Sequence, residues 1–130
     1  MVTTFVAIGI GASLGAFFRW GLGIVLNPVF PTIPLGTLAA NIIGGFLMGL
    51  FMGLSRGHAF FPEWVRLGVA TGFLGGLTTF STFSGEAVNL IGHQEYLFAT
   101  FLIGGHLVGS LLATGLGLYM GKLFLSSVST

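Results

Sequence analysis

The chain reads GFLGGLTTFSTFS over residues 72–84, in the middle of a long apolar segment. Three glycines fall within the first five of these residues, and five hydroxyl side chains fall within the last seven. Such a run suits a lipid-facing helix badly, because irregular or polar backbone at membrane depth is tolerated only where protein buries it or water reaches it. Helices that break in mid-membrane are also a common way to build ion sites. The stretch therefore predicts a broken helix that forms the functional centre.

The composition of the whole chain indicates an integral membrane protein. Of its 130 residues, 54% are hydrophobic and 5% are charged, and the mean hydropathy of +1.02 lies far above that of a soluble domain. The net charge of +1 gives no reason to expect a nucleic-acid partner. The absence of cysteine excludes disulfides and thiolate metal sites. The N-terminus lacks the basic start of a signal peptide, so we expect the first apolar segment to be retained.

The apolar segments predict four transmembrane helices, since each span needs ~20 apolar residues. The expected elements form one transmembrane domain over residues 1–130, with helices at about 4–26, 34–54, 64–91 and 96–125. The third helix is expected to break near residues 75–79. Four spans place both termini on one side of the membrane, with Arg56, Arg66 and Lys122 toward that side and Arg19 toward the other. This weak bias permits insertion in both directions.

Small residues recur at every fourth position in each span, a spacing that lets membrane helices approach closely. The four series are Ala7, Gly11 and Gly15; Gly45, Gly49 and Gly53; Gly68, Gly72 and Gly76; and Gly105, Gly109, Ala113, Gly117 and Gly121. The last series is the longest, and it predicts an extensive helix contact. Four helices can hardly enclose a pore and also seal it from lipid, so we expect an oligomer.

Two polar residues within the spans each allow two interpretations. Arg19 can extend its long side chain to the membrane surface, or it can face an aqueous vestibule and attract anions. Asn41, with Thr37 one turn before it, can form a helix–helix hydrogen bond or present an amide donor to an ion. The residues alone leave both questions open.

Two further polar groups lie on the third and fourth spans. His106, Ser110 and Thr114 follow an i, i+4, i+8 spacing and form either a polar track or a set of hydroxyls bonded back to their own helix. No second histidine or carboxylate has ligand spacing to His106, which argues against a metal site there. The other group is Glu86, Asn89 and His93. We interpret it as the solvated end of a helix, although its glutamate is the only carboxylate expected within the membrane.

The chemistry of the central stretch suits ions of both signs. Phe80 and Phe83 share one face of a helix, and the edge of an aromatic ring carries partial positive charge. Ring edges can therefore hold a small anion whose shell is completed by amide and hydroxyl donors. If residues 75–78 are not helical, their carbonyl oxygens lose their i+4 donors and become hard ligands for a small cation. A structural metal ion could then hold the break together.

The residues that carry these features resemble the signature of the small fluoride channels called Fluc or CrcB. The matching sequences are Gly-x-x-Gly-Gly-x-Thr-Thr-Phe-Ser-Thr-Phe over residues 72–83, Gly36-Thr37-Leu38-x-x-Asn41 with the following Gly44-Gly45, and Arg19-Trp20. The resemblance covers the full length of the chain. It implies an all-α, four-helix subunit in an antiparallel, dual-topology homodimer, with two fluoride pores that are each built from both subunits.

The resemblance also implies roles for individual residues. The implied pore residues are Phe80, Phe83, Asn41, Ser110, Thr114, Thr37, Ser81 and Thr82. Of these, the phenylalanines would supply ring edges and the asparagine a polar donor. The carbonyls of Gly75 and Thr78 from both subunits would bind a central sodium ion, and Arg19 would belong to the vestibule. At least some members of that family have serine at the position of His106, so the resemblance gives this histidine no pore role.

Weak-acid chemistry gives such a channel a purpose. Neutral HF crosses a bilayer and dissociates in a less acidic cytoplasm, which traps fluoride inside. A membrane potential is worth ~2.3 kcal/mol per charge per 100 mV, and a negative interior drives the anion outward. A passive channel in the inner membrane of a microbe would therefore relieve fluoride toxicity. The sequence has no Walker-type loop, catalytic triad or metal-hydrolase spacing, so we predict that it is not an enzyme.

Two alternatives belong to other classes of protein. A small multidrug-type, proton-coupled transporter of organic cations would also have four helices and dual topology. It needs a carboxylate in its first helix, where this chain has Arg19 instead. A structural subunit of a larger complex would account for the small-residue series, but it would leave the stretch at 72–84 without a purpose.

Overall fold

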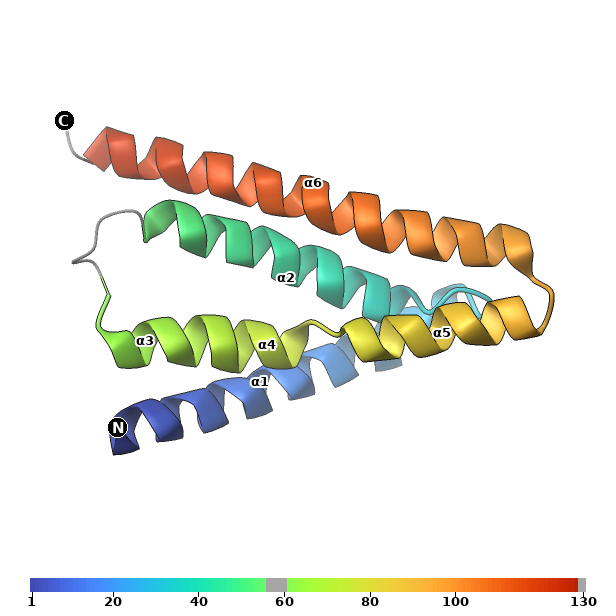
Figure 1. The fold of residues 1–130 in the computed structure, drawn as a ribbon, viewed down its shortest axis with the longest axis horizontal. Coiled ribbons are helices and arrows are strands. Elements are labelled where there is room, and N and C mark those ends of the chain that lie inside the picture. The colour runs from blue at the N-terminus through green and yellow to red at the C-terminus, as the bar shows by residue number, and fades with distance from the viewer. Residues whose placement is uncertain (56–60, 129–130) are drawn as a thin grey trace.

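The computed structural model describes residues 1–55 and 61–128, and all the regular elements within them are helical. In chain order they are α1 (Val2–Leu26), the short 3-10 helix η1 (Asn27–Val29), α2 (Leu35–Leu54), α3 (Glu63–Leu67), the π-helix η2 (Gly68–Leu74), α4 (Gly75–Leu77), α5 (Phe80–Gly92) and α6 (Tyr96–Val128). Figure 1 shows the start of α1 and the end of α6 at the same end of the molecule. Arg56, one of the residues in the charge comparison, lies outside the described residues.

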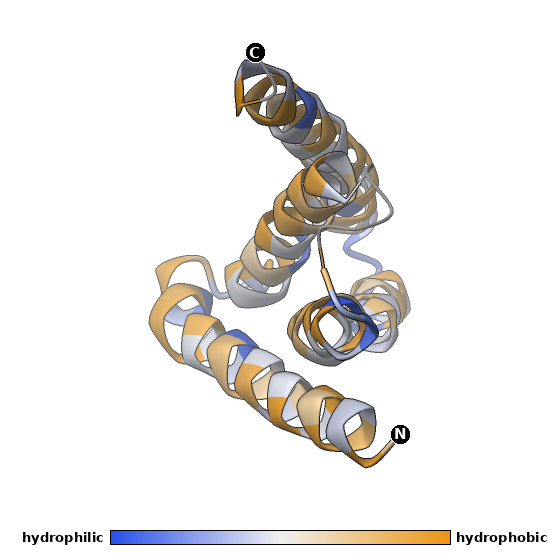
Figure 2. Cartoon of the chain, turned by 90° about the vertical axis from the view of Figure 1, so that its left-hand side faces the viewer, coloured by the Kyte–Doolittle hydropathy of each residue, from blue (hydrophilic) through white to orange (hydrophobic). Residues whose placement is uncertain are grey.

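Three helical stretches within the described residues are long and apolar enough to cross a membrane. They are Val2–Val29, Leu35–Leu54 and Tyr96–Val128. The third segment is divided into shorter helices, so it does not form a fourth uninterrupted span. Large apolar side chains are mostly exposed on this single chain, and Figure 2 shows hydrophobic residues, coloured orange, along the lengths of the helices. These features confirm an all-helical, multi-pass membrane protein.

The helices pack in two close pairs. α1 lies against the run α3–η2–α4, and α2 lies against α6 (Figure 1). A methyl group at Gly76 would overlap the carbonyl oxygen of Ala12 in α1, and one at Gly49 would overlap the carbonyl oxygen of Thr114 in α6. The helix backbones therefore touch with no side chain between them. This confirms the packing role that the spacing of small residues predicts.

The third segment breaks at Thr78 and Thr79, whose backbones are both extended, with ψ angles of 154° and 118°. The predicted break over residues 75–79 is too long, because Gly75–Leu77 is helical. The hydroxyl oxygen of Thr79 accepts the backbone N–H of Thr82 at 3.1 Å and so caps α5. Since a side-chain cap replaces a missing helical partner, the helix restarts directly after the break.

Candidate functional site

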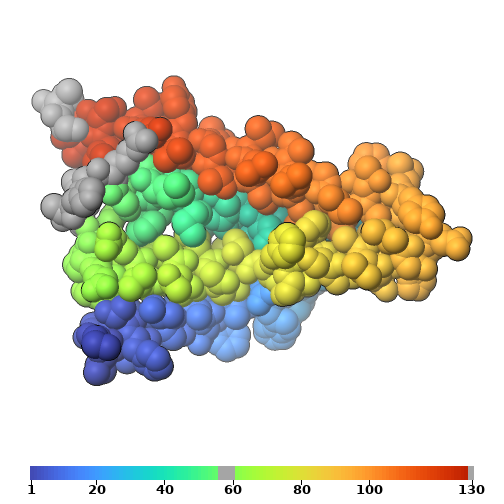
Figure 3. Space-filling model, in the orientation of Figure 1, coloured from blue at the N-terminus to red at the C-terminus, as the bar shows by residue number. Residues whose placement is uncertain are grey.

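A cavity of about 630 Å³ opens beside the break. Figure 3 shows α2 recessed between α6 and the third segment on this face of the molecule. The cavity is lined by Asn41, Gly44, Gly45, Met48, Ala70, Leu74, Gly75, Thr78, Thr79, Phe80, Phe83, Ile103, His106, Leu107, Ser110, Leu111 and Thr114. This set contains five of the eight predicted pore residues and both predicted carbonyl ligands. The fold therefore gathers residues from three distant parts of the chain at one place.

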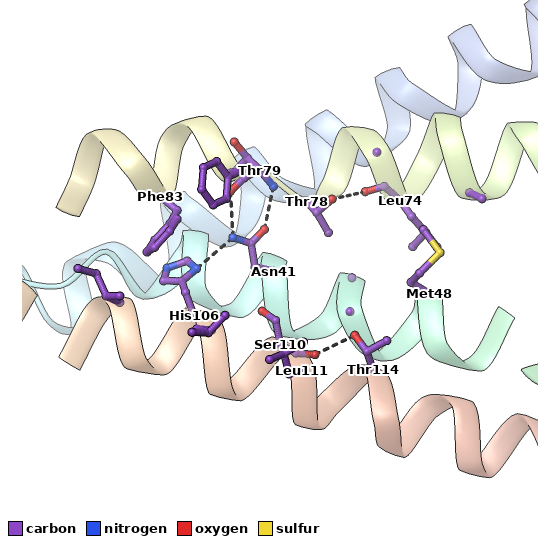
Figure 4. Close-up of a pocket in the computed structure, with 17 residues that line it drawn as sticks. Asn41, Met48, Leu74, Thr78, Thr79, Phe83, His106, Ser110, Leu111 and Thr114 are labelled. Carbon is purple, nitrogen blue, oxygen red and sulfur yellow. Dashed lines mark hydrogen bonds between the residues drawn. The ribbon is translucent and has the colours of Figure 1, made fainter. Parts of the chain in front are cut away.

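Asn41 lies at the centre of a hydrogen-bond network beside this cavity (Figure 4). Its Oδ1 accepts the backbone N–H of Thr79 at 2.8 Å, and its Nδ2 donates to the backbone carbonyl of Thr79 at 3.0 Å and to Nδ1 of His106 at 3.0 Å. The side-chain amide thus replaces backbone bonds that the break removes. Both amide hydrogens are engaged, as the helix–helix interpretation of Asn41 expects. That Asn41 donates a hydrogen bond to an ion stays a prediction, and it requires Nδ2 to give up one of its two present bonds.

Two carbonyl groups beside the break lose their helical donors. The i+4 donor of Gly75 is the N–H of Thr79, which donates to Asn41 instead. The i+4 donor of Thr78 is the N–H of Thr82, which donates to the hydroxyl of Thr79. Both carbonyl-bearing residues line the large cavity. Uncharged carbonyl oxygens freed in this way fit a small, hard cation.

Aromatic rings connect the outer surface of the chain with its interior. The ring centroids of Phe80 and Phe83 are 5.5 Å apart in an edge-to-face arrangement, and those of Phe83 and His106 are 4.5 Å apart. Phe80 is 78% exposed, whereas His106 is only 4% exposed. On a single chain the outer end of this row of rings is therefore uncovered.

A smaller cavity of about 250 Å³ shares no lining residue with the first and contains three of the four other side chains predicted to bind or attract anions. Arg19 is half-buried and lines this cavity together with Thr37 and Thr82. The hydroxyl of Thr37 donates to the carboxylate of Glu86, and the hydroxyls of Ser81 and Thr79 lie 3.2 Å apart. None of Arg19, Thr37, Ser81 and Thr82 lines the large cavity. The structure thus divides the predicted residues between the two cavities, except for Ser81, which lines neither.

Sequence reasoning missed two residues of the site. Glu86 is half-buried and bonded to Thr37, so its interpretation as part of a solvated helix end is wrong, although Asn89 and His93 are indeed exposed. A carboxylate expected within the membrane needs a polar partner, and this requirement could have indicated from the sequence that Glu86 is bonded to another residue. The hydroxyl of Thr79 caps α5, and the backbone N–H and C=O groups of the same residue both bond to the side-chain amide of Asn41. A hydroxyl residue directly before a restarting helix is a recognisable cap pattern.

Comparison with known proteins assigns the family. The family described as CrcB-like protein, Camphor Resistance (CrcB), matches residues 6–118. The chain belongs to the CrcB family. Among its CrcB relatives, the fluoride-specific ion channel FluC of Thiobacillus denitrificans is 52% identical, over 93% of this chain and 98% of the relative. Proteins of the same name from Nitrosospira multiformis and Bordetella pertussis are 54% and 51% identical, over 89% and 93% of this chain and 91% and 93% of each relative. The resemblance to CrcB drawn from the sequence is confirmed.

Proposed function

We propose that this CrcB chain is a passive, fluoride-selective ion channel that lets fluoride leave the cytoplasm and so relieves its toxicity. The observation that carries the proposal is the cavity beside the break, where aromatic rings, an asparagine amide and hydroxyl groups from α2, the third segment and α6 converge. Neutral N–H and O–H donors and the positive edges of aromatic rings suit a small anion, and among the described residues no carboxylate that would attract an organic cation lines the cavity. The names of the relatives agree with this chemistry. The activity is transport, so the protein is not an enzyme.

The proposed pore uses both cavities. Phe80 and Phe83 supply ring edges, and Asn41 supplies a donor when it exchanges one of its internal bonds. The proposed polar track consists of Ser110, Thr114, Thr37, Ser81 and Thr82. Arg19 attracts anions in the vestibule, where its half-buried guanidinium lines the smaller cavity. A cation at this place raises the local concentration of fluoride without binding it tightly.

Flux measurements on liposomes test the function directly. The purified full-length protein is reconstituted, and efflux is followed with a fluoride electrode beside a chloride trace. We expect rapid fluoride loss without chloride loss, and we expect Phe80→Ile and Asn41→Asp to abolish it. Asn89→Ala, at an exposed position of α5, is the matched control and should leave the flux unchanged. A folded protein that passes no fluoride would overturn the proposal, and proton-driven uptake of organic cations would be tested next.

The functional unit is proposed to be an antiparallel homodimer of four-span subunits in the inner membrane, with two pores built from both subunits. Support comes from Phe80, which lines the cavity yet is 78% exposed on one chain, so a second copy would complete its surroundings. The chain has no cysteine, so Glu95→Cys introduces one reactive site into a turn. In intact cells a membrane-impermeant maleimide should label about half of the molecules if both orientations occur. Complete labelling or none would contradict dual topology.

A structural sodium ion at the dimer centre is also part of the proposal. The carbonyls of Gly75 and Thr78 suit it, because Asn41 and Thr79 take the N–H groups that would otherwise satisfy them. Sodium would neutralise partial negative charge that converges from both subunits. Replacing sodium by N-methylglucamine should weaken the dimer, measured by crosslinking yield and thermal unfolding in detergent. Equal dimer stability in both salts would count against the site.

A further inference from the structure

His106 has a defined tautomer because the network around Asn41 fixes every donor and acceptor. The backbone N–H of Thr79 can only donate, so the atom of Asn41 that it meets is Oδ1. The other atom is then Nδ2, which bonds the carbonyl of Thr79 with one hydrogen and faces Nδ1 of His106 with the other. Since Nδ2 can only donate, Nδ1 must accept. The imidazole is therefore neutral and carries its hydrogen on Nε2.

The resulting Nε2–H group is buried and has no partner among the described residues. The His106 side chain is only 4% exposed, and it lines the large cavity together with Phe83 and Ser110. A buried donor without an acceptor is unfavourable, and sites of this kind in native proteins call for a ligand or a functional reason. The part of the chain that the structure describes supplies no acceptor for it.

We propose that the Nε2–H of His106 is a direct hydrogen-bond donor to the permeating anion. The inference rests on the proposed fluoride channel and adds a residue to its pore. An N–H group can offer nothing to a cation, whereas a small anion accepts a short, charge-assisted bond from it. The Phe83 ring lies beside the imidazole in a tilted arrangement, and Ser110 lies one helical turn along α6. These groups form one donor-rich wall of the cavity.

The two ring nitrogens of His106 have different roles in this proposal, since Nδ1 accepts from Asn41 and Nε2 donates to the anion. Two substitutions test these roles separately. Gln reaches the position of Nε2 and offers an N–H there, whereas Asn reaches only the position of Nδ1. We expect His106→Gln to keep fluoride efflux within a few-fold of the parent and His106→Asn to lower it about tenfold or more, the effect of removing one hydrogen bond to a charged group. Both variants are reconstituted in liposomes and compared at equal amounts of folded protein.

The reverse ranking, with His106→Asn active and His106→Gln inactive, would show that the residue acts only by positioning Asn41, and it would overturn the inference. Full activity in both variants would overturn it as well. If the parent protein itself passes no fluoride, the proposed function fails, and that result is distinct from either ranking of the variants.

Spectroscopy on the parent protein decides the case in which both variants fail to fold or to conduct. Protein labelled with ¹⁵N-histidine in lipid nanodiscs is titrated with sodium fluoride and, separately, with sodium chloride. The buried Nε2–H resonance should move downfield with fluoride and stay in place with chloride. A resonance that does not respond to fluoride, or that responds equally to both salts, would overturn the inference.

Discussion

The two halves of the third segment differ in how they are held. Before the break, the run α3–η2–α4 lies directly on α1, and glycines bring the backbones together. After the break, Gly85 and Gly92 of α5 face open space, and this half is fixed instead by side chains from α2 and α6. The first half is therefore a rigid support, and the second half can present polar groups to an ion. The Asn41–Thr79 bonds join the two kinds of structure.

Replacing one glycine in each half should separate these roles with the largest effect. A methyl group in Gly76→Ala would overlap the backbone of Ala12, which cannot move without separating α1 from the third segment. We expect this variant to yield no folded protein. Gly85→Ala has no atom within 4 Å of the new methyl group and should fold at least as well as the parent. Yield and monodispersity on size-exclusion chromatography measure both, and equal yields would contradict the rigid-support interpretation.

Removing the junction between the halves should have the next largest effect. Asn41→Ala leaves the N–H and C=O groups of Thr79 and the Nδ1 of His106 without the amide. Each unsatisfied buried group costs roughly 1–3 kcal/mol, so we expect a loss of about 2 kcal/mol or more in the free energy of unfolding. Denaturant unfolding in detergent measures this. Asn89→Ala on the exposed face of α5 is the control, and an equally small change in both variants would mean that the break does not depend on the amide.

The half of the third segment before the break can be predicted from the sequence because the features that determine it are local. Apolar length fixes the helices, and a spacing of four between small residues fixes which faces meet. The break was also visible, since glycines precede a cluster of hydroxyl residues at 72–84. Its true extent was not, because Gly75–Leu77 stays helical and only two threonines are extended.

The hydrogen bonds that Asn41 makes at the break could not be predicted in the same way, because the bonded residues are far apart along the chain. Asn41 bonds Thr79, which lies 38 positions away, and His106, which lies 65 positions away. No periodicity links such residues, and the choice among possible partners depends on how the helices are arranged in space. The same holds for the pair of Thr37 and Glu86, 49 positions apart. Sequence thus identified polar residues at membrane depth without showing which of them bond each other.

The smallest effect is expected at the cap that restarts the helix. Thr79→Val keeps the β-branched shape that favours an extended backbone but removes the hydroxyl that accepts the N–H of Thr82. We expect a loss of about 1 kcal/mol in the free energy of unfolding, typical of a lost N-cap. Thr79→Ser retains the hydroxyl and should stay close to the parent in the same denaturant titration. If the two variants are equally stable, the Asn41 amide alone holds the break, and the cap contributes nothing to joining the halves.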